Sequence, residues 1–328
     1  MSVPVTEWLD ILEREYLAGF ITAGGAAVKF AVGGDDPLAF VQRQLREISR
    51  THNLIFIPID AGDTRLHMIQ DLFFAVARAI DWNALAQRFA EALFKENGYV
   101  WPKPGCPIPL PDLATTNRID ITLLRREINQ WLTQKIMHDS EMTQDFRVAM
   151  TQLCLLQMAP RSPEATIEVP IMQWLRGELR AISALKSAPI TARITRYNGR
   201  AMLRSACHWL RRCGQRGLSL TLDIRQLGRA AKSAEGHVHY SPGAVMDGFE
   251  VLRQLIDEAE HFPGMQLVVL ADDTLTGDDK SRSLGVYLAL KWRVWDDVRA
   301  QGHDNPLAPL VRLAASPIMT LDTSVAPP

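Results

Sequence analysis

The segment AAVKFAVGGDDPLAF, residues 26–40, predicts the fold of this chain. Residues 26–32 form a short apolar run, interrupted only by Lys29, that leads into Gly33-Gly34 and then into a helix-forming stretch. A buried strand, a glycine turn and a helix in this order are the layout of a phosphate-binding P-loop. The segment therefore predicts one strand of an α/β sheet, with a loop of the phosphate-binding type at the carboxyl end of this strand.

The residues that give a P-loop its chemistry are absent from this segment. The motif is G-x-x-x-x-G-K-[ST], and counting from Gly33 puts Leu38 at the second glycine, Ala39 at the lysine and Phe40 at the Ser/Thr position. No ammonium group then reaches the β- and γ-phosphates, and no hydroxyl holds Mg²⁺. The sequence predicts a lost or heavily altered nucleotide site. The alternative interpretation is an ordinary strand-to-helix turn, because such turns favour Gly and Asp.

Four short apolar runs alternate with helical patterns along the chain, at residues 26–32, 54–60, 218–224 and 266–271. Continuous apolar strands separated by helices are typical of a mainly parallel sheet covered on both faces. The stretch between the second and third runs, residues 61–217, is far too long for one crossover helix. We therefore expect an α/β protein with a three-layer core, a mainly parallel sheet and a long helical insertion.

These patterns divide the chain into five expected segments. They are an N-terminal helix at 1–25, the first part of the α/β core at 26–97, a mostly helical insertion at 98–197, the second part of the core at 198–313, and a tail at 314–328.

Composition predicts a cytoplasmic protein without a membrane partner. Lys and Arg number 36 and Asp and Glu 37, so the whole-chain charge does not predict a polyanion as partner and any basic surface must be local. The four cysteines, which include no C-x-x-C pair, are interpreted as reduced thiols. No basic-then-apolar signal region starts the chain, and no uncharged apolar run reaches the roughly 18 residues of a membrane span.

Acidic residues follow the predicted strands at their carboxyl ends. Asp272-Asp273 end the fourth apolar run, and Asp60, Asp223 and Asp272 are expected to gather with Gly33 at one edge of the sheet, where open α/β sheets bind ligands. Such carboxylates either bind a cation or lie solvated in surface loops. Asp223 occupies the place of a Walker B acid, but the catalytic glutamate that usually follows is replaced by Ile224. By spacing alone, a turn or helix cap is the favoured interpretation of Asp223.

An arginine stripe is the clearest charge pattern in the sequence. Five arginines fall within roughly 80° of one face if the whole segment is helical; they are Arg193, Arg196, Arg200, Arg204 and Arg211. Three interpretations are open: contact with a nucleic-acid backbone, contact with an acidic protein partner, or a solvated helix face. If Gly199 delays the start of the helix, Arg193 and Arg196 lie outside the stripe.

A metal site is not predicted. His237 and His239 are two residues apart and would share one side of a strand, but two ligands without a third do not form a zinc site.

Five blocks of the sequence resemble a known family. They occur in matching order and are EYLAGFITAGGAAVKFAVGG (15–34), TRLHMIQDLFFAVARAIDW (64–82), RYNGRAMLRSACHWLRRCGQRGLSLTLDI (196–224), MDGFEVLRQLIDEAEHFPGMQLVVL (246–270) and SLGVYLALKWRVWDDVRAQGHDNPLAPLVRL (283–313). The blocks resemble the ATP-binding-domain proteins associated with BREX (bacteriophage exclusion) and related bacterial defence islands. The resemblance spans roughly residues 5–313.

This resemblance implies a P-loop NTPase-like fold of the AAA+/STAND type and a role in antiphage defence. It also implies that Gly33-Gly34 are a relic phosphate loop and that Asp223 is the Walker B position. ATPase members of the family have a G-K-[ST] loop and an acidic pair after the third strand, whereas this chain has Ala39, Phe40 and Ile224 there. The chain thus resembles a branch with an altered loop. Arg299 and Arg312 are only candidates for an arginine finger.

We therefore expect a non-catalytic, pseudo-NTPase subunit of a defence system, with no required cofactor. It would act as a scaffold beside a helicase, a methyltransferase or an active ATPase, and the arginine stripe would contact a partner or DNA. The first alternative is an active noncanonical ATPase that binds ATP through backbone N–H groups and holds Mg²⁺ through Asp223. The second is a DNA-binding regulator that does not depend on nucleotide.

Overall fold

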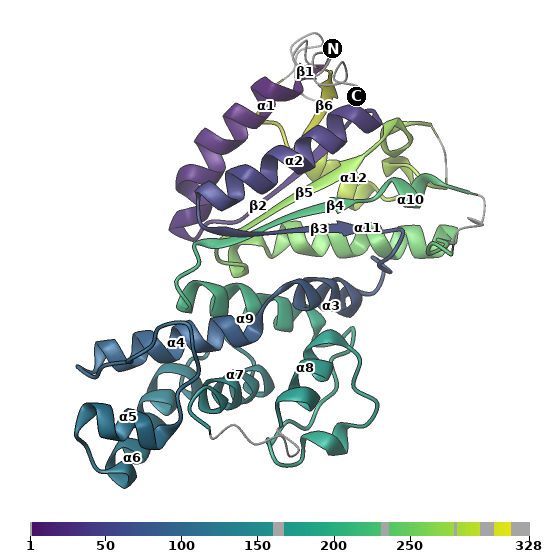
Figure 1. Ribbon diagram of the computed structural model, residues 1–328. Helices are drawn as coiled ribbons and strands as arrows, with labels where there is room; N and C mark the ends of the chain where they lie inside the picture. The colour runs from purple at the N-terminus through teal and green to yellow at the C-terminus, as the bar shows by residue number, and fades with distance from the viewer. Residues whose placement is uncertain (1, 160–166, 231–235, 279–280, 296–304, 316–328) are drawn as a thin grey trace, which may run out of the picture. The chain divides into compact units, whose positions relative to one another are not determined.

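The computed structural model describes residues 2–159, 167–230, 236–278, 281–295 and 305–315 (Figure 1). Within this described part, the chain divides into two units: residues 1–72 with 215–328, and residues 73–214. The expected boundaries of the helical insertion, at 98 and 197, thus lie inside the second unit. No described helix is long and apolar enough to cross a membrane.

The first unit is built on a parallel six-stranded sheet in the order β1-β6-β2-β5-β4-β3. The strands are β1 (Val3–Pro4), β2 (Ala27–Val32), β3 (Leu54–Asp60), β4 (Gly217–Asp223), β5 (Met265–Ala271) and β6 (Leu310–Ala314). The four strands predicted from apolar runs are confirmed to within one residue at each end. The two others, β1 and β6, were not predicted and pair in parallel at one side of the sheet.

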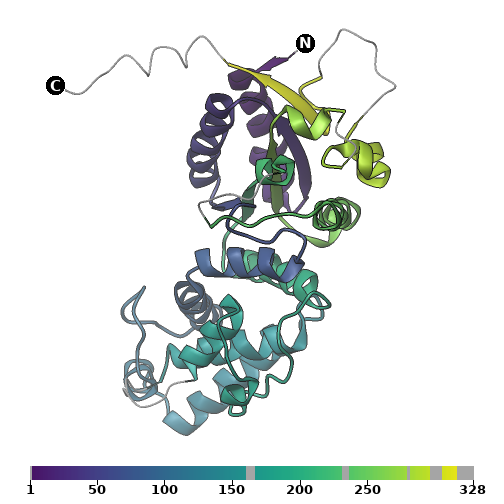
Figure 2. The same cartoon turned by 90° about the vertical axis from the view of Figure 1, so that its right-hand side faces the viewer.

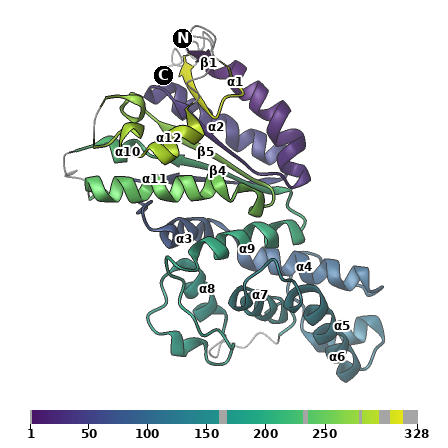
Figure 3. The same ribbon diagram turned by 180° about the vertical axis from the view of Figure 1, so that it is seen from behind.

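Helices cover both faces of this sheet, which makes the first unit a three-layer α/β structure (Figures 1 and 2). One face is covered by α1 (Val5–Leu12), its π-helical continuation Glu13–Ile21, and α2 (Asp35–Thr51). Buried side chains of these helices pack on alternate strand residues such as Ala31, Val268 and Leu270. The opposite face is covered by α11 (Pro242–Asp257) and α12 (Leu288–Val294), seen from behind in Figure 3.

The second unit is helical, in agreement with the long helical insertion expected from the sequence. Its main helices are α4 (Trp82–Glu96), α5 (Leu110–Asn117), α6 (Ile121–Leu132), α7 (Gln144–Leu156), α8 (Glu168–Arg176) and α9 (Gly199–Arg212), while α3 (Ile69–Ala79) spans the boundary between the units. Its core contains aromatic pairs, such as Phe89 and Trp209 with ring centroids 4.8 Å apart. Each such buried ring removes a large apolar area from water, so aromatic packing is a main source of stability in this unit.

Candidate functional site

The carboxyl ends of the strands bring the predicted loop residues to one edge of the sheet. In the parallel register, Asp60 is paired with Asp223, and Val32 is paired with Ala271. The Gly33 N–H donates to the Ala271 carbonyl at 3.0 Å, so the glycine turn lies beside the end of β5. The topology therefore gathers Gly33, Asp60, Asp223 and Asp272 as the sequence predicted.

The connection from β2 to α2 contains only two residues, Gly33 and Gly34. Because α2 begins at Asp35, Leu38 is already helical and its N–H donates to the Gly34 carbonyl at 3.2 Å. In a P-loop, the residues between the two glycines form an open loop whose N–H groups cradle phosphate. Here the same positions form the first turn of a helix.

Side chains at the start of α2 do not favour an anion. Asp35 and Asp36 lie exposed in the first helical turn, and Pro37, which follows them, has no N–H to donate. Further along, Ala39 is exposed and Phe40 packs against the apolar core beneath α2. The first turn of this helix therefore presents negative charge where a phosphate would need positive charge.

Asp223 is the buried acid of this edge, and Arg225 binds it. The Asp223 side chain is 9% exposed, and both of its carboxylate oxygens lie 3.0 Å from the Arg225 Nε atom. The Arg225 backbone N–H also donates to Asp223 Oδ1, at 3.1 Å, which closes a local turn after β4. This bidentate, charge-assisted geometry is among the stronger hydrogen-bonding arrangements in proteins.

The Arg225 guanidinium also reaches the glycine turn, because its Nη1 atom pairs with Asp35 at the start of α2. The hydrogen bonds to Asp223 raise the pKa of Arg225, and the nearby charges of Asp223, Asp35 and Asp60 add to this effect against the opposing effect of burial. The Arg225 guanidinium thus joins Asp223, at the end of β4, to Asp35 at the start of α2.

The other acids at this edge also have partners from the protein. Asp60 accepts from the Gly62 N–H at 2.6 Å, and Asp272 accepts from the Thr274 N–H at 2.9 Å, so both cap their own turns. Arg312, a finger candidate, donates to Asp273 at 2.6 Å. Across the described ranges, no group of three or more metal-ligating side chains forms.

Two further predictions about this region concern histidines and arginines. Residues 236–240 do not form a strand, so the expectation that His237 and His239 share one side of a strand is wrong. His237 pairs with Asp63 at 3.3 Å. Arg299 lies outside the described residues.

The arginine stripe is divided by the start of α9. That helix begins at Gly199, so Arg193 and Arg196 precede it and lie exposed in the connecting segment, whereas Arg200, Arg204 and Arg211 lie on the helix and are half-buried. The three helical arginines are within about 40° of one another around the axis. On the other side of α9 the apolar residues are all buried: Met202, Leu203, Ala206, Trp209 and Leu210. The helix face is therefore not a flat, solvated stripe of five guanidinium groups.

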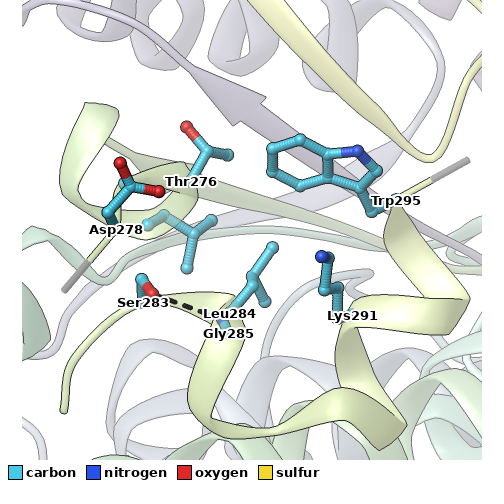
Figure 4. Close-up of a pocket in the computed structure, with 9 residues that line it drawn as sticks. Thr276, Asp278, Ser283, Leu284, Gly285, Lys291 and Trp295 are labelled. Atoms are coloured by element: carbon cyan, nitrogen blue, oxygen red, sulfur yellow. Dashed lines mark hydrogen bonds between the residues drawn. The ribbon is translucent and has the colours of Figure 1, made fainter. Parts of the chain in front are cut away.

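A pocket of about 540 Å³ lies near the end of β5, beside the turn that follows Asp272 (Figure 4). It is lined by the 3₁₀ turns Asp273–Thr276 and Leu284–Val286, and by α12 and the residue that follows it. The Lys291 ammonium lies 5.5 Å from the ring centroid of Trp295. None of the predicted site residues is among those that line this pocket, although Arg312 donates to the lining residue Thr276 at 2.5 Å.

Sequence reasoning missed Arg225, the residue that defines the site. The available indication was its position two residues after an acid at a strand end, from which a side chain can reach back to that acid. The Walker B pattern of an acid followed by a glutamate concerns positions 223 and 224 alone and therefore gives no indication of Arg225.

A parallel sheet between two layers of helices, with a glycine turn after β2 and an acid at the end of β4, defines a P-loop NTPase-like α/β protein. The family model of the BREX system ATP-binding protein BrxC/D matches residues 112–321. As the match covers well over half of the 328 residues, the chain belongs to this family. The matched region includes Asp223 and Arg225 and begins beyond Gly33-Gly34. Searches among curated proteins and solved structures gave no match.

Tyr240 fixes the loop after β3 and provides a pH test of this edge. Its hydroxyl accepts from the Leu66 N–H at 3.0 Å and lies 2.7 Å from the Thr64 carbonyl. Burial raises the pKa of Tyr240 to about 12, whereas an unfolded tyrosine titrates near about 10. Neutral Tyr240 therefore stabilises the fold fully below pH about 10, and this contribution is lost as the pH rises towards 12.

We expect Tyr240→Phe to lower the free energy of unfolding by about 1–2 kcal/mol at neutral pH, because the Leu66 N–H loses its buried acceptor. The variant should also lose less stability than the wild type between pH 8 and pH 11, since it has no phenol to ionise. Urea unfolding at both pH values measures these differences. The exposed Tyr197, changed to Phe, is the matched control, and equal effects of the two changes would contradict the prediction.

Proposed function

We propose that this protein is a non-catalytic, P-loop-like subunit of a BREX-type bacteriophage-exclusion system. The observation that supports this most is the bidentate pairing of Asp223 with Arg225, whose guanidinium continues to Asp35. In an active NTPase, Mg²⁺ and the P-loop lysine provide the positive charge between the Walker B acid and the phosphates. In this chain an arginine side chain already provides a positive charge there.

Three further features support the same proposal. The loop after β2 is two residues long, the first turn of α2 contains Asp35 and Asp36, and Ile224 occupies the place of the catalytic glutamate. Bound ATP would bring additional negative charge next to two carboxylates, and its phosphates would compete with both for Arg225. The same features argue against the alternative of a noncanonical ATPase, which would need open N–H groups at the start of this helix.

The proposed role is structural, within an assembly. The family description names the BREX system, so the proposed partners are other subunits of such a system: a helicase, a methyltransferase or an active ATPase. The P-loop-like unit would then provide a rigid docking scaffold whose edge is fixed by the Asp223–Arg225–Asp35 contacts rather than by nucleotide.

Calorimetric titration of the protein with ATP and with ADP, each with and without Mg²⁺, tests this proposal. We expect no Mg²⁺-dependent binding up to millimolar nucleotide, and no release of phosphate. Asp223→Ala is the matched variant, and it should behave like the wild type in both assays. Micromolar, Mg²⁺-dependent binding that is lost in Asp223→Ala would refute the proposal and favour the active ATPase.

A further inference from the structure

The turn that precedes α9 presents an exposed tyrosine on a hydrogen-bonded backbone. Tyr197 is 84% exposed, far more than a side chain of this size usually is. Asn198 secures the turn: its Oδ1 atom accepts from the Thr195 N–H at 2.7 Å, and its Nδ2 atom donates to the Arg193 carbonyl at 3.0 Å. The Gly199 N–H closes the turn on the Thr195 carbonyl at 2.8 Å. The ring is therefore held outward by a fixed turn.

One arginine side chain contacts this ring, and two more exposed arginines lie close to the turn in the chain or by hydrogen bond. The Arg196 guanidinium lies 4.9 Å from the Tyr197 ring centroid, and its Nη2 atom lies 2.9 Å from the Tyr197 hydroxyl. Arg193 donates to the carbonyl of Arg180 at 2.5 Å, which brings a third exposed arginine next to the turn. The exposed Tyr197 ring is thus in contact with one exposed arginine, and the hydrogen bond from Arg193 joins this turn to the segment that contains Arg180.

The local charge is strongly positive. Between residues 179 and 214 the helical unit contains eight arginine and lysine residues but no aspartate or glutamate, although the whole chain has a formal net charge of −1. The exposed Glu178 stands just before this stretch. Asp145 is close to this segment, but it is half-buried and accepts from the Ala192 backbone N–H at 3.3 Å. The surface therefore complements a polyanion rather than a neutral or basic partner.

We propose that Tyr197, Arg196, Arg193 and Arg180 form a binding surface for single-stranded nucleic acid. An unpaired base would stack on the outer face of the Tyr197 ring, and the guanidinium groups would contact the flanking phosphates. A duplex fits this surface less well, because its bases offer no free face to the ring. This surface is independent of the proposed loss of nucleotide chemistry, since it lies wholly in the helical unit.

Fluorescence anisotropy with a labelled oligothymidine and with a duplex of the same length tests the proposal. We expect the single strand to bind more tightly than the duplex, and Tyr197→Ala to weaken single-strand binding roughly tenfold. Tyr197→Phe keeps the stacking face and should bind almost as the wild type does. A double change of Arg193 and Arg196 to Ala should reduce the slope of log affinity against log salt by about 1.4.

The matched control removes the same charge elsewhere in the helical unit. Arg125 and Arg126 are both exposed on α6, and changing both to Ala should leave single-strand affinity nearly unchanged. The proposal would be overturned by no binding at low salt, by equal weakening in the two double variants, or by unchanged affinity in Tyr197→Ala. It would also be overturned if the Arg193 and Arg196 changes removed a protein partner while single-strand binding stayed intact.

Discussion

Gly217→Ala is expected to lower the free energy of unfolding by about 3 kcal/mol or more, a larger loss than most core substitutions cause. A Cβ atom at Gly217 would lie 2.0 Å from the Gly264 carbonyl oxygen and 2.8 Å from its carbon. Both are backbone atoms, so no side-chain rotation relieves the clash. The same carbonyl accepts from the Leu218 N–H at 2.8 Å, which fixes the close approach at the start of β4.

Urea unfolding followed by circular dichroism measures this loss, and reduced yield of folded protein is the extreme form of the same result. Gly34→Ala is the matched control in the same unit. A Cβ atom at Gly34 meets nothing within 4 Å, and its φ of −73° suits any residue. That change should be neutral or stabilising by up to about 1 kcal/mol. A Gly217→Ala variant as stable as Gly34→Ala would show that β4 and the Gly264 turn are not in close contact.

Arg225→Met is expected to destabilise the protein by about 2–3 kcal/mol, because it leaves the Asp223 carboxylate buried without its cation. Methionine keeps most of the apolar stem of arginine, so the loss reports on the guanidinium group. The estimate is below the range for fully buried pairs because the Arg225 side chain is 28% exposed and water can partly replace it. Chemical denaturation at neutral pH gives the value.

Two further variants show whether the Asp223 contact is responsible. Asp35→Asn removes the charge of the other partner of Arg225. Because the Asp35 side chain is 91% exposed, this change should lower the free energy of unfolding by less than about 1 kcal/mol. The double variant Asp223→Asn with Arg225→Met should be more stable than Arg225→Met alone, because the uncompensated charge is then absent. If all three variants had the same stability, Arg225 would not be compensating a buried charge.

The sheet was largely predictable from sequence because its strands are continuous apolar runs. β4 and β5 are buried at every position, and that requirement leaves a strong pattern in the chain. β6 was missed because it is short and half-buried, with the polar Arg312 at its centre, and a five-residue run of this kind has no distinctive pattern. Its place beside β2 depends on pairing with a strand far away in sequence.

The sequence predicted the strand-end positions of the candidate site but not the contacts of Arg225. The sequence placed Gly33 and Asp223 at the same edge, because parallel strands end together there. It did not predict that Arg225 binds Asp223 or reaches Asp35, because Arg225 and Asp35 are 190 residues apart. Likewise, the helical period grouped five arginines, but only the start of α9 at Gly199 divided them into an exposed pair and a half-buried set.

The sequence by itself determined the α/β class, the helical insertion, the family resemblance and the absence of a P-loop lysine and hydroxyl. These properties depend on the identity and local spacing of residues, and both can be read directly from the sequence. Only the tertiary structure decided which charges meet at the sheet edge and which aromatic ring is left exposed. Those properties depend on contacts between distant segments, and the energy of a charge depends on the partner and the burial that the folded chain provides.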